Sequence, residues 1–452
     1  TSLIKTVYWD MNNIKTPKND NTCGWSEIIA SRASCAQVLG NIKTDWLVVG
    51  AGYTGLSAAR SLALLHPNKR IVLIDGQKAG EGASARNSGY LVDSTLNDGH
   101  LSDTGLSAYQ QKYQLNKAGL EATKVLVEQH KILCDWSEIG KIHATATVKN
   151  EQKLQRFSET LEQLNLTHNV LSGATLKNRL GTNYYRLGIE TKGAVMLQPA
   201  SLVRGLIDIL PENITLFEHS PMLEWQSTRM NGNQRYQVTC PGGTITANGI
   251  IFAVNGFMPA IGLNRNRVFP LTLTASLTRP LSDAEYQSIG QPSQWGLLSA
   301  HAMGATVRLT QDKRLMIRNT AEVWGPMSMS AADLNQRKAT HIDGLRKRFP
   351  QLAADAIEYT WSGITCISKN NANVFSQIDK HAFAAGCYNG GGIGLGILYG
   401  QQIALYASGG TSDKISLIQN RPKPKKLPSP PFLNWGVALR LKKDRYFAKT
   451  ER

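Results

Sequence analysis

The stretch DWLVVGAGYTGLSAARSLALLHPNKRIVLID (Asp45–Asp75) decides how this chain folds. It opens with a short apolar run that ends at Gly50, which is typical of a buried parallel strand. The segment 53–66 then carries apolar residues at helical spacing without an internal proline, and the segment 70–75 is a second apolar run. This succession of strand, helix and strand predicts a β-α-β unit.

The junction between the first strand and the helix reads G-A-G-Y-T-G, with glycines at Gly50, Gly52 and Gly55. Glycines at this spacing permit a tight turn, close approach of a pyrophosphate to the backbone, and close packing of the helix on the strand. The start of the helix, at Tyr53 and Thr54, offers N–H groups and the positive end of a dipole to an anion. The junction therefore predicts a dinucleotide site.

Asp75 strengthens this prediction. It ends the second strand 20 residues after Gly55, where a carboxylate binds ribose hydroxyls and disfavours a 2′-phosphate. An ordinary glycine turn is the alternative for a lone G-x-G-x-x-G. The strand, helix, second strand and acid in register favour nucleotide binding.

Composition narrows the class of protein. The 452 residues are 42% hydrophobic and 18% charged, which suits a folded chain with a sizeable core. No run approaches the roughly 20 apolar residues that a membrane span needs, and the first residues lack the pattern of a secretory signal. The six cysteines contain no C-x-x-C pair, which favours free thiols in a reducing cytoplasm over a zinc site or a disulfide scaffold. We therefore expect a cytoplasmic protein without a metal site.

The positive charge is concentrated at the end of the chain. Of the net charge of +17, the segment 421–452 carries +8, from ten basic residues and two acids. A nucleic-acid enzyme more often spreads its basic residues along the fold, so we expect no nucleic-acid partner. The stretch PFLNWGVALRLKKDRYFAK (Pro431–Lys449) has the composition of a helix that lies on an anionic membrane surface, at the inner face of the membrane. Packing of this segment on the protein's own surface is the alternative, and we favour it.

Two further motifs carry a family resemblance. GEGASARNSGYLV (Gly80–Val92) follows the first β-α-β unit, and AAGCYNGGGIGLGILYGQQIA (Ala384–Ala404) is a glycine-rich turn that opens a late helix. Together with the first motif they resemble the D-amino acid oxidase-like superfamily of FAD amine oxidoreductases. The resemblance is closest to the bacterial γ-glutamylputrescine, sarcosine and glycine oxidase branches, and it runs from about 45 to 407.

The resemblance implies FAD and assigns residues to it. The loop 84–89 would lie along the ribityl chain and the flavin ring, and the turn 390–394 would cap the pyrimidine end, where a helix N-terminus stabilises negative charge. A further strand end at 255–256 would form the second wall of the cleft, and the strand near Met222 would contact adenine; core sheet is the alternative for both. The cofactor-binding residues expected are Gly50, Gly52, Tyr53, Thr54, Gly55, Asp75, Gly76, Ser84, Ala85, Arg86, Asn87, Ser88, Gly89, Met222, Asn255, Gly256, Gly390, Gly391, Gly392, Ile393 and Gly394.

The fold class expected is α/β, with a discontinuous Rossmann-like FAD-binding domain and an α+β substrate domain whose antiparallel sheet covers the flavin. Helices are expected near 103–133, 151–166, 173–181, 199–210 and 337–349, and strands between 265 and 320. The domain map has an N-terminal extension (1–44), an FAD-binding domain (45–140, 193–262 and 356–412), a substrate domain (141–192 and 263–355) and a basic C-terminal tail (413–452).

The substrate site must be sought in the strand-rich segment, whose hairpin ATVRLTQDKRLMIRN carries Arg308, Arg314 and Arg318. An arginine that faces a pocket would clamp a substrate carboxylate in bidentate fashion, whereas one on the outer face is solvated. Arg308 is the candidate clamp. His301, just before the hairpin, is a candidate active-site donor, with a structural histidine as the alternative.

Departures from the family pattern narrow the substrate and the flavin chemistry. The family's α-amino acid oxidases place an arginine shortly after a Trp-x-Gly, but here Trp361-Ser362-Gly363 leads into Ile-Thr-Cys. This disfavours a simple D-amino acid. Cys366 does not align with the cysteine that holds a covalent flavin in some members, so noncovalent FAD is expected. The lysine that promotes reaction with oxygen in sarcosine-type members has no counterpart in 314–318, which leaves a dehydrogenase open.

The function expected is FAD-dependent oxidation of a C–N bond in a primary or secondary amine. The substrate would be a polyamine, an acylated polyamine or an N-methyl amino acid, with oxygen or another acceptor re-oxidising the flavin. One alternative is a membrane-surface FAD dehydrogenase of an amino or hydroxy acid that passes electrons to a quinone or carrier. The other is a flavoprotein with a structural or partner-dependent role.

Overall fold

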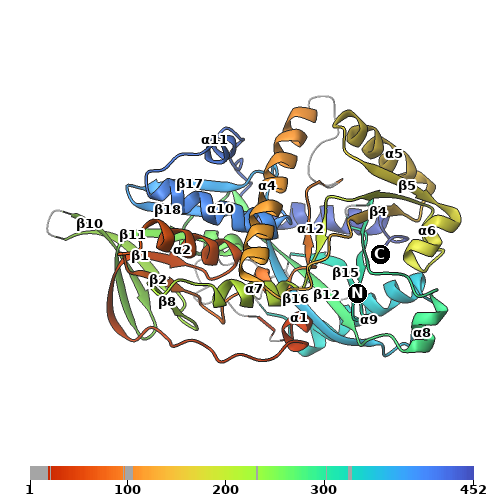
Figure 1. Ribbon diagram of the computed structural model, residues 1–452, viewed down its shortest axis with the longest axis horizontal. Helices are drawn as coiled ribbons and strands as arrows, with labels where there is room; N and C mark the ends of the chain where they lie inside the picture. Colours follow the sequence, from red (N-terminus) through yellow and green to blue (C-terminus); the bar gives the residue numbers. More distant parts are fainter. Residues whose placement is uncertain are drawn as a thin grey trace.

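The computed structural model describes residues 19, 20, 22–94, 96, 105–230, 233–301, 303–323 and 328–452. Two eight-stranded sheets organise these residues, one at each side of the view in Figure 1. The first is built around the β-α-β unit that the sequence predicts, and the second is mostly antiparallel. This mixed α/β arrangement confirms the expected fold class.

Five parallel strands form the centre of the first sheet, in the order β18-β11-β1-β2-β8. The apolar runs of β2 and β18 and the last residues of β1 and β11 are buried, as expected for strands covered on both faces, whereas β8 at the edge of the sheet is partly exposed. β17 pairs antiparallel with β18, and β9 and β10 form an antiparallel extension of β11. The strands are β1 (Gly40–Val49), β2 (Ile71–Ile74), β8 (Ile214–Phe217), β9 (Glu224–Met230), β10 (Asn233–Cys240), β11 (Gly243–Phe252), β17 (Val374–Asp379) and β18 (Ala382–Gly386).

Helices α2 (Tyr53–Leu65) and α10 (Gly392–Ala407) pack closely against each other beside this sheet. Glycines make the contact possible, because a Cβ atom at Gly400 would lie 2.4 Å from the carbonyl oxygen of Thr54. The two helices therefore bring their N-termini to one end of the sheet. The neighbouring helices are α4 (Leu106–His130), α7 (Pro199–Asp208) and α11 (Asp413–Gln419).

The second sheet has the strand order β16-β12-β15-β14-β13-β4-β6-β5, with one parallel pair between β13 and β4. Its strands are β4 (Lys141–Thr145), β5 (His168–Ser172), β6 (Leu187–Thr191), β12 (Val268–Thr278), β13 (Trp295–Ser299), β14 (Thr306–Leu309), β15 (Leu315–Glu322) and β16 (Ile357–Ser368). The helices of this half are α5 (Val148–Gln163), α6 (Gly173–Leu180), α8 (Asp283–Ser288) and α9 (Ala331–Arg348).

Two boundaries differ from the sequence-based domain map. β16 pairs along its length with β12, so residues 357–368 lie in the second sheet, although the map places 356–412 in the nucleotide domain. β1 begins at Gly40 and pairs with β11 from there, so the first strand starts before residue 45. In both cases backbone pairing with a distant strand sets the boundary, and local sequence does not reveal that partner.

The segment before β1 packs into the molecule. α1 (Gly24–Glu27) buries Trp25, whose ring meets that of Trp361 edge to face at 6.1 Å between centroids. The remaining short elements are α3 (Ala83–Arg86), β3 (Tyr90–Leu91), β7 (Val195–Met196) and η1 (Asn255–Ile261), of which β3 and β7 pair with each other.

The C-terminal segment is also anchored. α12 (Pro430–Phe447) ends near the second sheet, where the buried carboxylate of Glu451 accepts hydrogen bonds from Ser299, Thr145 and Asn150. None of the helices in the described part of the chain is both long and apolar enough to cross a membrane.

Candidate functional site

A cavity of about 520 Å³ lies between the two sheets. One wall comes from the carboxyl ends of the parallel strands, at Val49, Ile74 and Ala253, and the facing wall comes from β12 and β16. The carboxyl ends of parallel strands are where open α/β sheets bind ligands. The size is that of a small-molecule or cofactor site.

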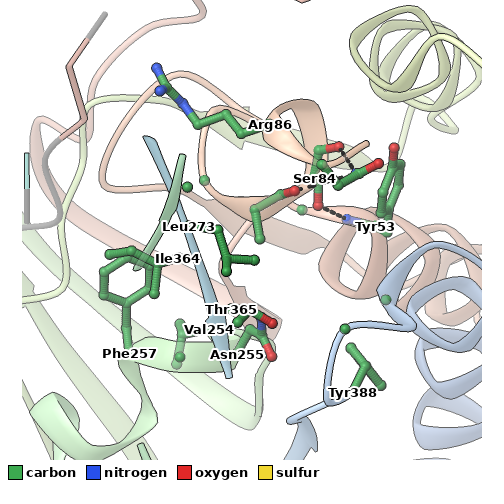
Figure 2. Close-up of a pocket in the computed structure, with 18 of the residues that line it drawn as sticks. Tyr53, Ser84, Arg86, Val254, Asn255, Phe257, Leu273, Ile364, Thr365 and Tyr388 are labelled. Atoms are coloured by element: carbon green, nitrogen blue, oxygen red, sulfur yellow. Dashed lines mark hydrogen bonds between the residues drawn. The ribbon is translucent and has the colours of Figure 1, made fainter. Parts of the chain in front are cut away.

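The predicted glycine turn occupies one end of this wall. Gly50 has φ +98°, and a Cβ atom at Gly55 would lie 1.6 Å from the carbonyl oxygen of Gly50, so both positions require glycine. Tyr53 N donates to Ser84 Oγ at 3.0 Å, and this hydrogen bond joins the start of α2 to the loop 82–89 (Figure 2).

Asp75 ends β2 within this wall. Its carboxylate accepts hydrogen bonds from the backbone N–H groups of Ala51 (2.7 Å) and Gln77 (2.9 Å). Burial raises the pKa of Asp75 to about 6, although both hydrogen bonds oppose the shift. The side chain lines the cavity, in the position expected for binding a ribose.

The loop 82–89 is held by its own side chains. Asn87 Nδ2 donates to the carbonyl oxygen of Ser84 at 2.6 Å, and Asn87 Oδ1 accepts from Gly89 N at 2.8 Å. Arg86 Nη1 donates to Asp20 Oδ1 at 2.7 Å and to the carbonyl oxygen of Ser362 at 2.9 Å. These contacts fix the loop between the N-terminal segment and β16.

The second glycine-rich turn lies at the start of α10. Cys387, Asn389 and Gly390 all have positive φ, and a Cβ atom at Gly390 would meet nothing within 4 Å. The Tyr388 hydroxyl lies 2.7 Å from Thr54 Oγ1, which joins this turn to the first one. The N-termini of α2 and α10 therefore open onto the same cavity.

Most of the expected cofactor residues come together here. Those that line the cavity are Gly50, Gly52, Tyr53, Thr54, Asp75, Gly76, Ser84, Arg86, Asn87, Ser88, Met222, Asn255, Gly256, Gly390, Gly391, Gly392 and Ile393. Gly55, Ala85, Gly89 and Gly394 lie behind this lining. Gly394 serves packing, because a Cβ atom there would lie 2.7 Å from Leu91 Cδ1.

These residues fit a dinucleotide. Two helix N-termini offer N–H groups to anions, the buried acid Asp75 stands at the end of β2 where a ribose is expected, and Gly82 and Gly390 leave open space where a side chain would project. Gly50 and Gly52 would lie along the pyrophosphate, and the turn at 390–392 would face the flavin. No group of three His, Cys, Asp or Glu side chains suited to a metal ion occurs among the described residues.

The structure places the two candidate catalytic residues outside the cavity lining. Arg308 is buried behind the loop, where Nη1 donates to the carbonyl oxygens of Ser88 (3.0 Å) and Leu197 (2.8 Å). His301 Nδ1 accepts from Met303 N at 3.3 Å, and the backbone N–H of His301 donates to Ser299 Oγ. Both side chains serve local structure through these contacts.

Of the three arginines in the hairpin, Arg318 is the one in the cavity wall. Arg314 pairs with Asp312 and Glu358 at the surface. Arg318 Nη2 donates to Thr306 Oγ1 at 2.6 Å. Among the residues that the structure describes, no Asp or Glu forms an ion pair with Arg318. Burial lowers the pKa of Arg318, because its charge is shielded from water.

The second sheet supplies a row of lining residues, most of which the sequence analysis did not identify. Leu273 pairs with Gly363 of β16 and Ala321 of β15, and Thr306 pairs with Arg318 and Leu298. All of these line the cavity. Because successive side chains of a strand point to opposite faces, the sequence could have shown which residues of one strand share a face. It could not show which strands lie side by side, because the partners that create the row are distant in sequence.

Cys366 is buried and does not line the cavity. Burial and the neighbouring Cys387 thiol raise the pKa of Cys366 well above its usual value. The thiol therefore faces the protein interior, away from the expected flavin site.

Comparison with known proteins agrees with this site. A family model described as FAD dependent oxidoreductase (DAO) matches residues 45–405. The probable oxidoreductase OrdL of Haemophilus influenzae is 24% identical over 83% of this chain and 85% of its own length. The gamma-glutamylputrescine oxidoreductase of Escherichia coli is 24% identical over 90% of this chain and 94% of its own length.

Solved structures share the fold. Glycine oxidase from Geobacillus kaustophilus superposes with a TM-score of 0.67 at 17% identity, over 82% of this chain and 96% of that chain. NikD, an amino acid oxidase of nikkomycin biosynthesis, gives 0.66 at 14% identity, over 86% of this chain and 99% of that chain. The family model spans well over half of the sequence, and this chain therefore belongs to the DAO family of FAD-dependent oxidoreductases.

Proposed function

We propose that this enzyme oxidises the C–N bond of a primary or secondary amine that also carries a carboxylate. The observation that carries the proposal is the position of Arg318 in the wall of the cavity that most of the expected cofactor residues line. Gamma-glutamylated amines and N-methyl amino acids combine an amine with a carboxylate, whereas free polyamines do not.

The cavity wall suits an anionic substrate group. Among the described residues three charged side chains line it, Asp75, Arg86 and Arg318, and Arg86 is paired with Asp20. Arg318 has only Thr306 as a described hydrogen-bond partner, which leaves guanidinium N–H groups for a ligand. An arginine shielded from water binds a carboxylate through two parallel hydrogen bonds, so it can orient a substrate as well as attract it.

The position of this arginine differs from the family pattern. In the sequence analysis, the resemblance places the clamp shortly after the Trp-x-Gly of β16, where Ile364 and Thr365 now line the cavity. Arg318 stands on β15, which is separated from β16 by β12. A clamp on a different strand would hold the carboxylate at a different place relative to the flavin from the one that the α-amino acid oxidases use, which supports a substrate other than a simple D-amino acid.

FAD, when bound, supplies the hydride acceptor for such a reaction. The chain contributes orientation and exclusion of water: Leu273, Ala321 and Trp361 form an apolar part of the lining beside Arg318. A substrate held there by its carboxylate would present its C–N bond in a site shielded from solvent, which favours hydride transfer.

The test is anaerobic flavin reduction. The purified protein is mixed with γ-glutamylated amines, sarcosine, glycine, D-amino acids and free polyamines, and loss of the oxidised flavin band is followed. Bleaching by a carboxylate-bearing amine is expected. Bleaching by free polyamines alone would contradict the carboxylate requirement, and absence of bleaching by every amine would contradict amine oxidation.

Arg318→Met isolates the role of the clamp. We expect KM for the carboxylate-bearing substrate to rise about 100-fold, since a charged hydrogen-bonded pair contributes roughly 3 kcal/mol, while the FAD content stays unchanged. Arg314→Met, on the same hairpin but paired at the surface, is the matched control. An unchanged KM in the Arg318 variant would remove Arg318 from substrate binding.

The acceptor is part of the same proposal. No lysine occurs among the described residues that line the cavity, and such a lysine is what the family resemblance associates with rapid reaction with oxygen. We therefore propose slow re-oxidation in air and faster re-oxidation by an artificial quinone acceptor, measured by stopped-flow after anaerobic reduction. Faster re-oxidation by oxygen would identify the enzyme as an oxidase.

A further inference from the structure

The outer face of α12 is unusual for a folded protein. Phe432, Trp435, Leu439 and Tyr446 are 69%, 56%, 69% and 75% exposed. At 100° per residue these four positions fall within about 60° of the helix circumference, so they form one continuous stripe. This stripe of four side chains is called the α12 stripe below.

Exposed aromatic side chains are concentrated on α12. Together with Phe447, its aromatic members are all the exposed Phe, Trp and Tyr side chains of the described residues. A monomeric protein buries such side chains elsewhere, and a group of them exposed on one helix marks an interaction surface.

The helix is held in place, so the stripe is a fixed surface. On its inner side Leu441 and Ala448 are buried. After the helix, Arg348 donates to the carbonyl oxygen of Glu451 at 2.8 Å. Before the helix, Leu427 N donates to the carbonyl oxygen of Asn266 at 2.6 Å. The helix is anchored at both ends and still presents its large apolar residues to solvent.

Charge indicates what covers the stripe. Lys442 and Lys443 lie at its two edges and are exposed, and Arg440 is exposed beside them. The two acids of the segment 421–452 are turned away: Asp444 pairs with Arg440, and Glu451 is buried. Among the described residues no acid pairs with Lys442 or Lys443, so the face combines aromatic residues with the positive charge of these two lysines.

We propose that the α12 stripe and its flanking lysines dock this enzyme on an anionic membrane surface. Aromatic rings lie at the level of the lipid headgroups, and lysines reach the phosphates, in helices that bind in the plane of a membrane. Each basic residue near such a surface strengthens binding about fivefold. The inference concerns a surface apart from the cavity and does not depend on the proposed substrate.

The experiment uses the full-length flavoprotein and co-sedimentation with vesicles of phosphatidylcholine, with or without phosphatidylglycerol. We expect sedimentation with the anionic vesicles at low salt and release at high salt, where charges are screened. Absence of sedimentation with phosphatidylglycerol vesicles would overturn the proposal. Truncation of the whole tail is avoided, because Glu451 anchors the second sheet.

Two variants locate the surface. The triple variant Phe432→Ser, Trp435→Ser, Leu439→Ser should lose sedimentation, whereas Leu133→Ser, at a side chain 90% exposed outside α12, should not. Lys442→Gln with Lys443→Gln should weaken partitioning about 30-fold, and the exposed pair Lys177→Gln with Lys380→Gln should leave it within about threefold of wild type. These side chains are exposed, so folding is preserved and flavin absorbance confirms it.

A protein partner is the competing occupant. Light scattering coupled to size exclusion measures whether the wild-type chain self-associates without lipid. Self-association that the triple variant abolishes would assign the stripe to a second copy of this chain and overturn the membrane proposal. A monomer that binds only anionic vesicles through the stripe supports it.

Discussion

Asp20 and Arg86 form a buried ion pair, with 2.7 Å between Asp20 Oδ1 and Arg86 Nη1 and both side chains at most 2% exposed. Asp20 Oδ2 also accepts from the backbone N–H of Ser362 at 2.8 Å. One carboxylate from the segment before the first strand thus joins the loop of the expected flavin site to the strand that faces it. Arg86 and both neighbours of Ser362 line the cavity.

This pair predicts an effect on the cofactor. Asp20→Asn removes the nearer partner of the buried Arg86 charge and leaves Glu81, 3.7 Å away, as its acidic neighbour, which should destabilise this region by about 3 kcal/mol. We expect weaker FAD retention, measured as the flavin-to-protein absorbance ratio after dialysis. Asp283→Asn, at a fully exposed carboxylate paired with Lys313, is the matched control. Full flavin retention by Asp20→Asn would show that the pair does not support the site.

Acidification should act on the same pair. Burial opposes ionisation of Asp20, but Arg86 and the hydrogen bonds from Ser362 outweigh it and lower the pKa of Asp20. A lowered pKa contributes stability above the unfolded value near 4, and that stability is lost as the pH falls through the folded value. The difference in Tm between wild type and Asp20→Asn should therefore shrink as the pH is lowered below about 4. A constant difference would contradict this linkage.

The pH dependence of stability that Asp75 contributes to the apoprotein should have the opposite sign to that of Asp20. Burial raises its pKa to about 6, so the folded apoprotein binds the proton more tightly than the unfolded chain does. The contribution of Asp75 is present below about pH 4 and is lost as the pH rises to about 6, by roughly 3 kcal/mol. Thermal unfolding of wild type and Asp75→Asn across this range should show it. Parallel profiles of the two proteins would exclude a raised pKa.

Removal of the acid also tests the nucleotide site. Asp75→Ala should release FAD, because the ribose position loses its acceptor and the N–H groups of Ala51 and Gln77 lose theirs. The purified variant should be colourless at a dilution where wild type stays yellow. Glu358→Ala, at a partly exposed surface pair, serves as the control. A fully yellow Asp75→Ala protein would contradict the assignment of the site.

Arg308 should behave differently from Arg318. Its Nη1 holds the carbonyl oxygens of Ser88 and Leu197, and its guanidinium lies 5.1 Å from the ring centre of Trp25. Arg308→Met should therefore lower FAD retention and Tm without a selective rise in KM. Measurement of KM at saturating FAD, with Arg314→Met as the control, separates a role in holding the loop of the FAD site from a role in substrate binding. A raised KM with normal FAD retention would restore Arg308 as a substrate residue.

The end of the chain predicts a stability effect. Burial opposes ionisation of Glu451, but hydrogen bonds from Ser299, Thr145 and Asn150 outweigh it and lower its pKa. Glu451→Ala leaves these donors unsatisfied and should cost about 1–3 kcal/mol, measured as a lower Tm at neutral pH. The difference should narrow below about pH 4 as the carboxylate is protonated. An unchanged Tm would show that the last residues do not anchor the fold.

The sequence by itself determined the nucleotide half of this protein. Gly50 and Gly55 have tasks that only a residue without a side chain can perform at that turn, Gly52 lies between them, and Asp75 follows at a fixed spacing. Such local requirements can be read directly, and the family model confirms the fold, the cofactor class and the enzyme class. The individual contacts of each residue with FAD stay predictions.

Only the tertiary structure decided the roles of the other residues. Arg308, Arg314 and Arg318 lie within eleven positions of one hairpin, yet one binds backbone carbonyls, one pairs at the surface and one lines the cavity. The expected packing of the C-terminal segment holds for its anchored ends but leaves the α12 stripe exposed. The physical reason is the same in each case: strand register and long-range packing choose which way a side chain points, and local sequence does not encode the partner strand.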